Sequence, residues 1–131
     1  MIYLPLIFCA FFEGLGKAFQ DSMIVGHWWS TIFSKYPKNS FFGNDGSRKY
    51  KNGNPNDGEK FMFGTSLLVC FTDCFHASGT LVIFSQILSL YYALSLPIDM
   101  NLIWYVVVGY CGLRTSTFHI FYTYVFFKKQ K

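Results

Sequence analysis

Charged side chains are scarce in this sequence. Asp, Glu, Lys and Arg make up 14% of its 131 residues, whereas soluble globular proteins carry about 25%. Hydrophobic residues reach 52% and aromatic residues 21%, among them 16 Phe and 9 Tyr, and the mean hydropathy is +0.28. Such a composition does not fit a small soluble globule with a charged surface. It favours a protein embedded in a lipid bilayer.

The sequence also lacks the local motifs that mark several enzyme classes. It contains no H-E-x-x-H zinc motif, no Walker loop, no G-x-S-x-G elbow and no dinucleotide-binding fingerprint. Its four cysteines show no C-x-x-C spacing, so neither a disulfide framework nor a zinc ribbon is supported. The net charge of +4 does not indicate a nucleic-acid partner, because the positive charges lie in loops beside apolar runs. Lipid headgroups are the expected partner of these charges.

Three long apolar stretches predict membrane-spanning helices, at about residues 2–33, 61–95 and 101–127. Each exceeds the roughly 20 residues that one crossing requires, so we expect tilt or a break, and a broken first or third helix would give four elements. Residues 34–60 between them are rich in Asn, Gly, Pro and charge, which predicts a polar loop. The predicted fold class is therefore all-α, an integral membrane helical bundle in which residues 1–131 form a single domain. Three helices bury little interior, so a homo-oligomer is a further expectation.

The distribution of Lys and Arg predicts the orientation of this bundle. The 34–60 loop carries six of them and the tail after residue 127 three more, whereas the connection at residues 96–101 carries none. Cytoplasmic loops are enriched in Lys and Arg. Two crossings separate the loop from the tail, so both are expected on the cytoplasmic side of the cell membrane. The N-terminus would then lie outside if the first segment crosses, and inside if that segment is re-entrant.

A polar seam runs along the first predicted helix. Glu13, Lys17 and Asp21 recur at intervals of four, and His27 falls about 40° from Glu13 on the same face. Ionised groups that face lipid near the midplane cost at least about 2.5 kcal/mol each. The seam should therefore face other helices or an aqueous cavity. Gly14 and Gly16 mark the place where a kink in this helix is expected.

The second and third predicted helices add further ionisable residues. Asp73 and His76 are one turn apart and can face the same point, and Arg114 and His119 lie in the middle and later part of the third helix. Arg114 needs a carboxylate partner, for which Glu13, Asp21 and Asp73 are available. Small residues beside it, Gly109 and Gly112, are expected to allow close helix approach. A compact bundle would gather all these ionisable residues into one buried cluster.

Two interpretations of this cluster remain open. Asp73 could neutralise Lys17 or Arg114 and lock the helices together, with His76 hydrogen-bonded to it. Alternatively, the cluster could carry out catalysis, metal binding or proton transfer, with Asp73, His76, Glu13 and Arg114 as catalytic residues. A divalent metal such as zinc requires three protein ligands and an open position. The candidate metal ligands are His27, Asp73, His76 and His119.

A segment from about residue 13 to residue 80 resembles a known family. It contains R-K-Y-K-N-G at residues 48–53, then Asn54-Pro55, G-T-S at residues 64–66 and T-D-x-x-H at residues 72–76. This combination is similar to small multi-span membrane proteins of Bacteroidota-type bacteria, in which W-x-N-K-Y-K-N-G-x-P precedes G-S-T-T and T-D-x-x-H. This sequence departs from that pattern in two places: Ser47 and Arg48 stand where the pattern has a Trp and an Asn nearby, and G-T-S at residues 64–66 is shifted relative to G-S-T-T. The resemblance implies a multi-span membrane protein and brings no established activity.

Three functional hypotheses follow from these residues. The first is a small membrane hydrolase acting on a lipid-like substrate, in which Asp73 and His76 act as a general acid and base or as metal ligands and Arg114 holds an anion or phosphate. The second is a channel or a subunit of a proton-coupled transporter, in which the polar seam lines a wet path. The third is a structural or accessory membrane protein whose buried ion pairs fix the helix register. The residues alone do not decide whether the protein is an enzyme.

Overall fold

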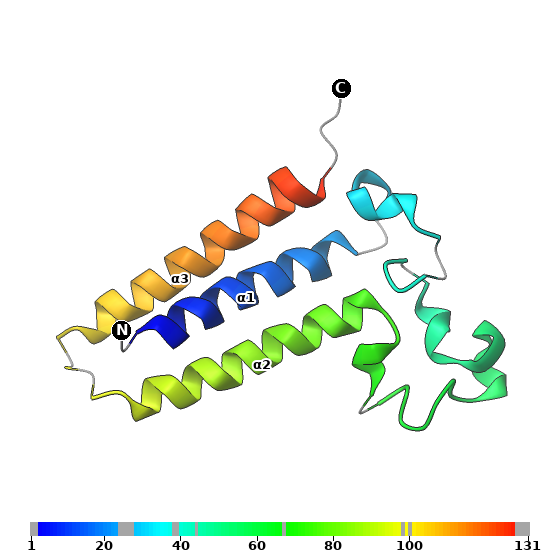
Figure 1. Cartoon of the computed structure of the whole chain (residues 1–131), viewed down its shortest axis with the longest axis horizontal. Helices are drawn as coiled ribbons and strands as arrows, with labels where there is room; N and C mark the ends of the chain where they lie inside the picture. The colour runs from blue at the N-terminus through cyan, green and yellow to red at the C-terminus, as the bar shows by residue number, and fades with distance from the viewer. Residues whose placement is uncertain are drawn as a thin grey trace.

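The structure, a computed structural model, describes residues 3–23, 28–37, 40–43, 45–66, 68–97, 99 and 101–127. This part of the chain contains three α-helices and no β-strand, which confirms the predicted all-α class. The helices are α1 (Leu4–Ser22), α2 (Cys74–Ser95) and α3 (Ile103–His119), and α3 continues as a π-helix over Ile120–Phe126 (Figure 1). Six short 3-10 turns complete the described structure: Trp28–Ser30, Ile32–Lys35, Gly46–Lys49, Lys51–Gly53, Pro55–Asp57 and Val69–Phe71.

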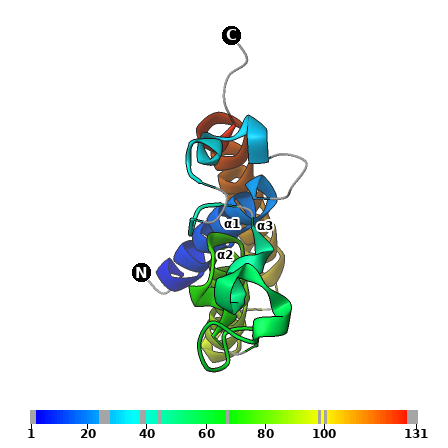
Figure 2. The same cartoon turned by 90° about the vertical axis from the view of Figure 1, so that its right-hand side faces the viewer.

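Helix α1 lies between α2 and α3 (Figure 1). Helices α1 and α3 run in the same direction and α2 runs in the opposite one, so the chain passes along the bundle three times. The 3-10 turns between α1 and α2 cover one end of the bundle, which Figure 2 views head-on, and α3 finishes at that same end. The connection between α2 and α3 lies at the other end, beside the start of α1. This arrangement places the 34–60 segment and the end of α3 together.

Glycines let α1 approach both neighbours closely. A Cβ atom added at Gly14 would lie 2.4 Å from the carbonyl oxygen of Arg114 in α3, and one added at Gly16 would lie 2.9 Å from Cγ2 of Val82 in α2. Helix α1 is continuous through both positions. Instead of the expected kink, the two glycines supply close helix packing on opposite sides of α1.

Gly109 and Gly112 have no comparable role. A Cβ atom at either position would meet nothing within 4 Å. The prediction that these two residues of α3 allow close helix approach is therefore wrong within this chain. The close approach between α1 and α3 comes from the α1 side.

The second helix starts later than its apolar sequence predicts. The prediction placed its start at about residue 61, but residues 61–66 form turns, Val69–Phe71 forms a 3-10 turn, and α2 begins at Cys74. The reason is a helix cap: the carboxylate of Asp73 accepts the backbone N–H of His76 at 3.0 Å, and Asp73 itself has extended backbone angles. The predicted end at the Leu96-Pro97 step agrees with the last helical residue, Ser95.

The first and third predicted helices are also divided. Helix α1 ends at Ser22 rather than at about residue 33, and the segment after it forms the 3-10 turns Trp28–Ser30 and Ile32–Lys35. Thr31 ends the first of these turns and caps the second, because its hydroxyl accepts the N–H of Phe33 at 3.3 Å. The third helix changes from α to π geometry after His119.

An aromatic core closes the end of the bundle that carries the 3-10 turns. Phe19 of α1, Phe33 of the second 3-10 turn and Phe126 at the end of α3 meet with ring centroids 4.4 to 5.3 Å apart. Phe33 and Phe126 are buried, as is Cys74 at the start of α2. These contacts join segments far apart in the sequence, and Cys74 belongs to the same core cluster at the start of α2.

Along the rest of the bundle, the usual distribution of polar and apolar residues is reversed. Large apolar side chains are exposed on the outer faces of α2 and α3, for example Leu94 at 80% and Trp104 at 71%. Buried positions between the helices include polar residues, namely Glu13, Ser78, Ser85 and Thr117. Among the described residues, α2 is long and apolar enough to cross a membrane, and 11% of its most apolar window is buried. It is therefore unlike the core helix of a soluble protein.

Candidate functional site

The carboxylate of Glu13 connects all three helices. Glu13 lies on α1 and is 4% exposed. Its Oε1 accepts a hydrogen bond of 3.0 Å from Nε2 of Gln86 in α2, and its Oε2 accepts one of 2.8 Å from the hydroxyl of Tyr110 in α3. Nε of Arg114, one turn further along α3, lies 2.5 Å from Oε1. The three partners satisfy both oxygens of the carboxylate and neutralise its charge.

The contact between Arg114 and Glu13 is an ion pair without hydrogen-bond geometry. The Nε atom of Arg114 is buried, and its N–H donates no hydrogen bond to any acceptor in the described part of the chain. The side chain as a whole is 40% exposed. The hydrogen bonds to Glu13 come from Gln86 and Tyr110, and Arg114 contributes its charge to this site.

The other members of the predicted seam are arranged separately. Lys17 and Asp21 form an ion pair along α1, with Nζ 2.7 Å from Oδ1. They line a cleft between α1 and α3, and Arg114 lines the same cleft. Lys17 and Asp21 therefore share one face of α1, as their spacing of four residues predicts, and this face borders the cleft against α3.

Asp73 and His76 form a second polar site at the start of α2. Nδ1 of His76 lies 2.9 Å from Oδ1 and 2.8 Å from Oδ2 of Asp73, and the hydroxyl of Thr72 donates to Oδ2 at 2.9 Å. Asp73 is 5% exposed, whereas the side chain of His76 is 31% exposed. A buried carboxylate therefore holds one ring nitrogen of a histidine that reaches the surface.

This pair has both a structural and a chemical consequence. The cap on α2 requires only the backbone N–H of His76. The second contact, through Nδ1, fixes the orientation of the imidazole and favours the tautomer that is protonated on Nδ1. Nε2 is then an acceptor and can take a proton from water or a substrate.

The predicted single cluster is divided in the described structure. Glu13 pairs with Arg114, and Asp73 pairs with His76. In the described ranges no hydrogen bond or ion pair joins Asp73 to Lys17 or Arg114. The separation follows from the late start of α2, which places Asp73 at the end of the bundle instead of inside a helix.

The predicted metal site is not assembled in the part of the chain that the structure describes. Of its four predicted ligands, Asp73 and His76 contact each other, and His119 is exposed near the end of α3. His27 lies outside the described residues. Within the described ranges, no group of three or more His, Cys, Asp and Glu side chains could hold a metal ion.

Gln86 and Tyr110 are the site residues that sequence reasoning missed. Both are hydrogen-bond donors inside apolar helices, and Tyr110 precedes Arg114 by four residues, which places the two on one face of α3. A buried carboxylate needs donors as well as a counter-charge. The need of Glu13 for donors could therefore have pointed to Gln86 and Tyr110 from the sequence.

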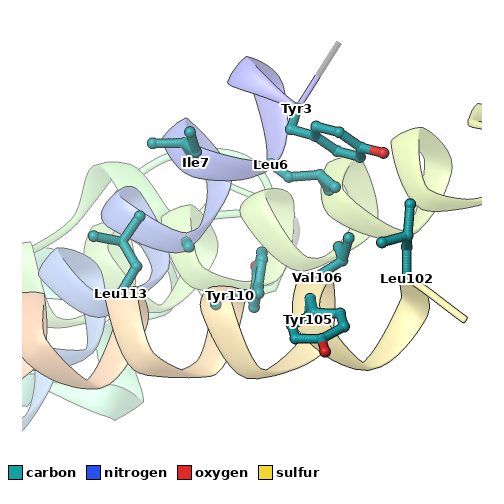
Figure 3. A pocket seen from close by; sticks show the side chains of 10 residues that line it. Tyr3, Leu6, Ile7, Leu102, Tyr105, Val106, Tyr110 and Leu113 are labelled. Atoms are coloured by element: carbon teal, nitrogen blue, oxygen red, sulfur yellow. The ribbon is translucent and has the colours of Figure 1, made fainter. Parts of the chain in front are cut away.

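An apolar cleft of about 370 Å³ lies between the first halves of α1 and α3, beside the Glu13 site. Figure 3 shows its side chains reaching in from both helices, with Leu6 and Ile7 on α1 and Val106 and Leu113 on α3. Tyr110, which donates to Glu13, forms part of its wall. The cleft fits hydrocarbon better than a polar molecule.

Comparison of the whole chain with known proteins finds no matching protein-family model, no matching curated protein and no matching solved structure.

Proposed function

We propose that the protein is an integral membrane protein in which α1, α2 and α3 cross the lipid bilayer. The observation that carries this proposal is the reversed polarity of the bundle. Exposed apolar side chains cover the outer faces of all three helices, for example Phe8 of α1, Phe84 of α2 and Val108 of α3. Such a surface is too large for a soluble monomer. In a bilayer this apolar surface contacts lipid tails, which are as apolar as the side chains themselves, so its exposure costs little free energy.

The buried polar groups support the same placement. In hydrocarbon each polar side chain needs an internal partner. Glu13 has partners on α2 and α3, and Ser78 donates to the carbonyl of Phe75 at 2.9 Å within α2. The positive charge of the 34–60 loop supports an orientation with this end of the bundle in the cytoplasm and the connection between α2 and α3 outside.

Within this framework, we propose that Asp73 and His76 act as a general base on a lipid-like substrate, in a small membrane hydrolase. Nε2 of His76 takes a proton from water as the water attacks an ester carbonyl, and Asp73 stabilises the imidazolium that forms. The imidazolium then gives this proton to the leaving alcohol as the ester C–O bond breaks, which releases the fatty acid. The start of α2 is at the end of the bundle, where water and the polar groups of lipids meet. Phe71, exposed by 70%, lies two residues before Asp73 and provides an apolar contact for the substrate.

A comparison of two histidine variants tests this activity. The protein is purified in detergent, and the release of fatty acid from phospholipid and monoacylglycerol micelles is measured. We expect His76→Gln to lower the rate by at least about a hundredfold. His119→Gln, which changes the exposed histidine of α3, is the matched control and should keep full activity. Equal rates in the two variants, or no release by the wild type, would refute the hydrolase proposal.

A second candidate function is favoured by the Glu13 site. Its carboxylate is buried and satisfied by Gln86, Tyr110 and Arg114, an arrangement that fixes the register of three helices. In this proposal the protein is a structural or accessory membrane component. It predicts folding and membrane insertion without any catalytic turnover. The hydrolase assay above separates the two proposals.

A further inference from the structure

A second cleft between α1 and α3 differs from the apolar one in its charge. It has a volume of about 260 Å³ and begins where Gly14 brings the two helices together. Two cations and one anion line it, along with a hydroxyl group and an aromatic ring; the lining residues are Gly14, Lys17, Asp21, Arg114, Thr115 and Phe118. On a surface that is otherwise apolar, this is a concentration of hydrogen-bond donors.

The donors of this cleft are only partly used within the protein. Lys17 is 42% exposed and contacts Asp21 with one of its three N–H groups. Arg114 forms its ion pair with Glu13 through Nε, and this N–H has no hydrogen-bond partner among the described residues. Within the same residues, the hydrogen bonds to Glu13 come from Gln86 and Tyr110 and not from the terminal nitrogens of Arg114. Those nitrogens can donate to an acceptor that enters the cleft.

We propose that this cleft binds the phosphate group of a membrane phospholipid. A guanidinium is well suited to a phosphate, which accepts two parallel hydrogen bonds from it. Lys17 adds a second charge and Thr115 a hydroxyl donor at the rim. This inference rests on the proposed membrane placement, because exposed cations on a helix in a bilayer need an anion from the lipid or a path to water.

The position of the cleft suits a headgroup. Lys17 lies five residues before the end of α1, about 8 Å along the helix axis. That end carries the polar segment and therefore lies at the bilayer surface. Lysine and arginine side chains reach several ångströms along a helix towards the interface. A phosphate at the surface is thus within reach of Lys17, and Arg114 lines the same cleft at a deeper position, beside Gly14.

Asp21 makes the site selective for the charge of the ligand. Its carboxylate is in the wall of the cleft and repels a second negative charge. A phosphodiester carries one negative charge, whereas inorganic phosphate and a phosphate monoester carry up to two. The cleft should therefore prefer phosphatidylglycerol to phosphatidic acid.

Binding can be measured on the full chain in detergent by native mass spectrometry. The probes are dioctanoyl phosphatidylglycerol, dioctanoyl phosphatidic acid, dioctanoylglycerol without phosphate, and inorganic phosphate. We expect phosphatidylglycerol to bind best and Lys17→Gln to weaken its binding about tenfold. Lys51→Gln, at an exposed lysine outside the bundle, is the control and should bind like the wild type. Asp21→Asn should strengthen the binding of phosphatidic acid and so reduce the preference for phosphatidylglycerol. Damaged folding would not produce this gain in binding.

Three results would overturn the inference. Equal binding of dioctanoylglycerol would mean that the acyl chains alone are recognised. Equal binding by Lys17→Gln and Lys51→Gln would place the phosphate elsewhere. Saturation by inorganic phosphate at lower concentration than by phosphatidylglycerol would identify a soluble ligand. Extraction of cell membranes with alkaline carbonate tests the membrane proposal separately. If the protein stays in the membrane but does not bind the phosphate group, only the lipid site is refuted.

Discussion

Nε of Arg114 lies 2.5 Å from Oε1 of Glu13, across the closest contact between α1 and α3. The carboxylate is buried and the guanidinium is partly exposed, so the pair joins the interior of the bundle to the cleft on its surface. Helix α2 takes part through Gln86, which donates to the same oxygen. One carboxylate therefore holds the three helices, and its removal should affect the whole fold.

We expect Glu13→Leu to destabilise the protein by about 3 kcal/mol, because it leaves the charge of Arg114 without its partner. The double variant Glu13→Leu with Arg114→Met should be more stable than either single variant, since it removes both charges. Asp21→Asn, which breaks the exposed pair with Lys17, should cost less than about 0.5 kcal/mol. Thermal unfolding in detergent, followed by tryptophan fluorescence, measures the stability of these variants and of the wild type, with Arg114→Met as the second single variant. A double variant less stable than both singles would contradict the assignment of Glu13 and Arg114 as a pair.

The glycines of α1 and α3 provide a second test, with a control of the same chemistry. Gly14→Ala adds a methyl group 2.4 Å from the carbonyl oxygen of Arg114, so the helices must separate. We expect a loss of about 1–3 kcal/mol in stability, as for other overpacked sites. Gly109→Ala places the same group in open space and should be neutral or slightly stabilising. Similar unfolding temperatures for the two variants would show that α1 and α3 do not touch at Gly14.

The sequence predicted the polar partners better than it predicted the helix boundaries. Glu13 was among three acidic candidates for Arg114, because a charge in an apolar helix requires a counter-charge. The start of α2 was missed because residues 61–71 are as apolar as the helix itself, and hydropathy does not separate a helix from an apolar turn. The local signal was Asp73, a capping residue before an apolar run.

The packing of α1 could not be predicted from the same information. Gly14 and Gly109 are both single glycines in apolar helices, and only the three-dimensional arrangement shows that one is in contact and the other is not. The division of the polar residues into two sites has the same origin. It depends on where α2 begins relative to α1, and the first residue of α2, Cys74, is placed by long-range packing in the core cluster that also holds Phe33 and Phe126.

Asp73 should show separable effects as a cap and as a partner of His76. Asp73→Ala removes the acceptor for the N–H of His76 and should cost about 0.5–2 kcal/mol. Hydrogen exchange of the first turn of α2, at Cys74 to Ala77, should then be faster. Asp73→Asn keeps a capping oxygen and should preserve this protection while lowering any hydrolytic rate, because the amide is neutral and cannot stabilise the imidazolium. If Asp73→Asn exchanges as fast as Asp73→Ala, the side chain does not cap α2.

The crossing of the membrane by α2 can be tested with two labelled positions. Lys51 is exposed in the polar segment before α2, and Asn101 is exposed in the connection after it. A cysteine is introduced at each in a variant without the four native cysteines, and intact cells are treated with a maleimide that does not cross membranes. If α2 spans the bilayer, Asn101→Cys reacts in intact cells, whereas Lys51→Cys reacts only after the membrane is opened. Reaction of both in intact cells, or of neither, would place the two ends of α2 on the same side and exclude an odd number of crossings between them.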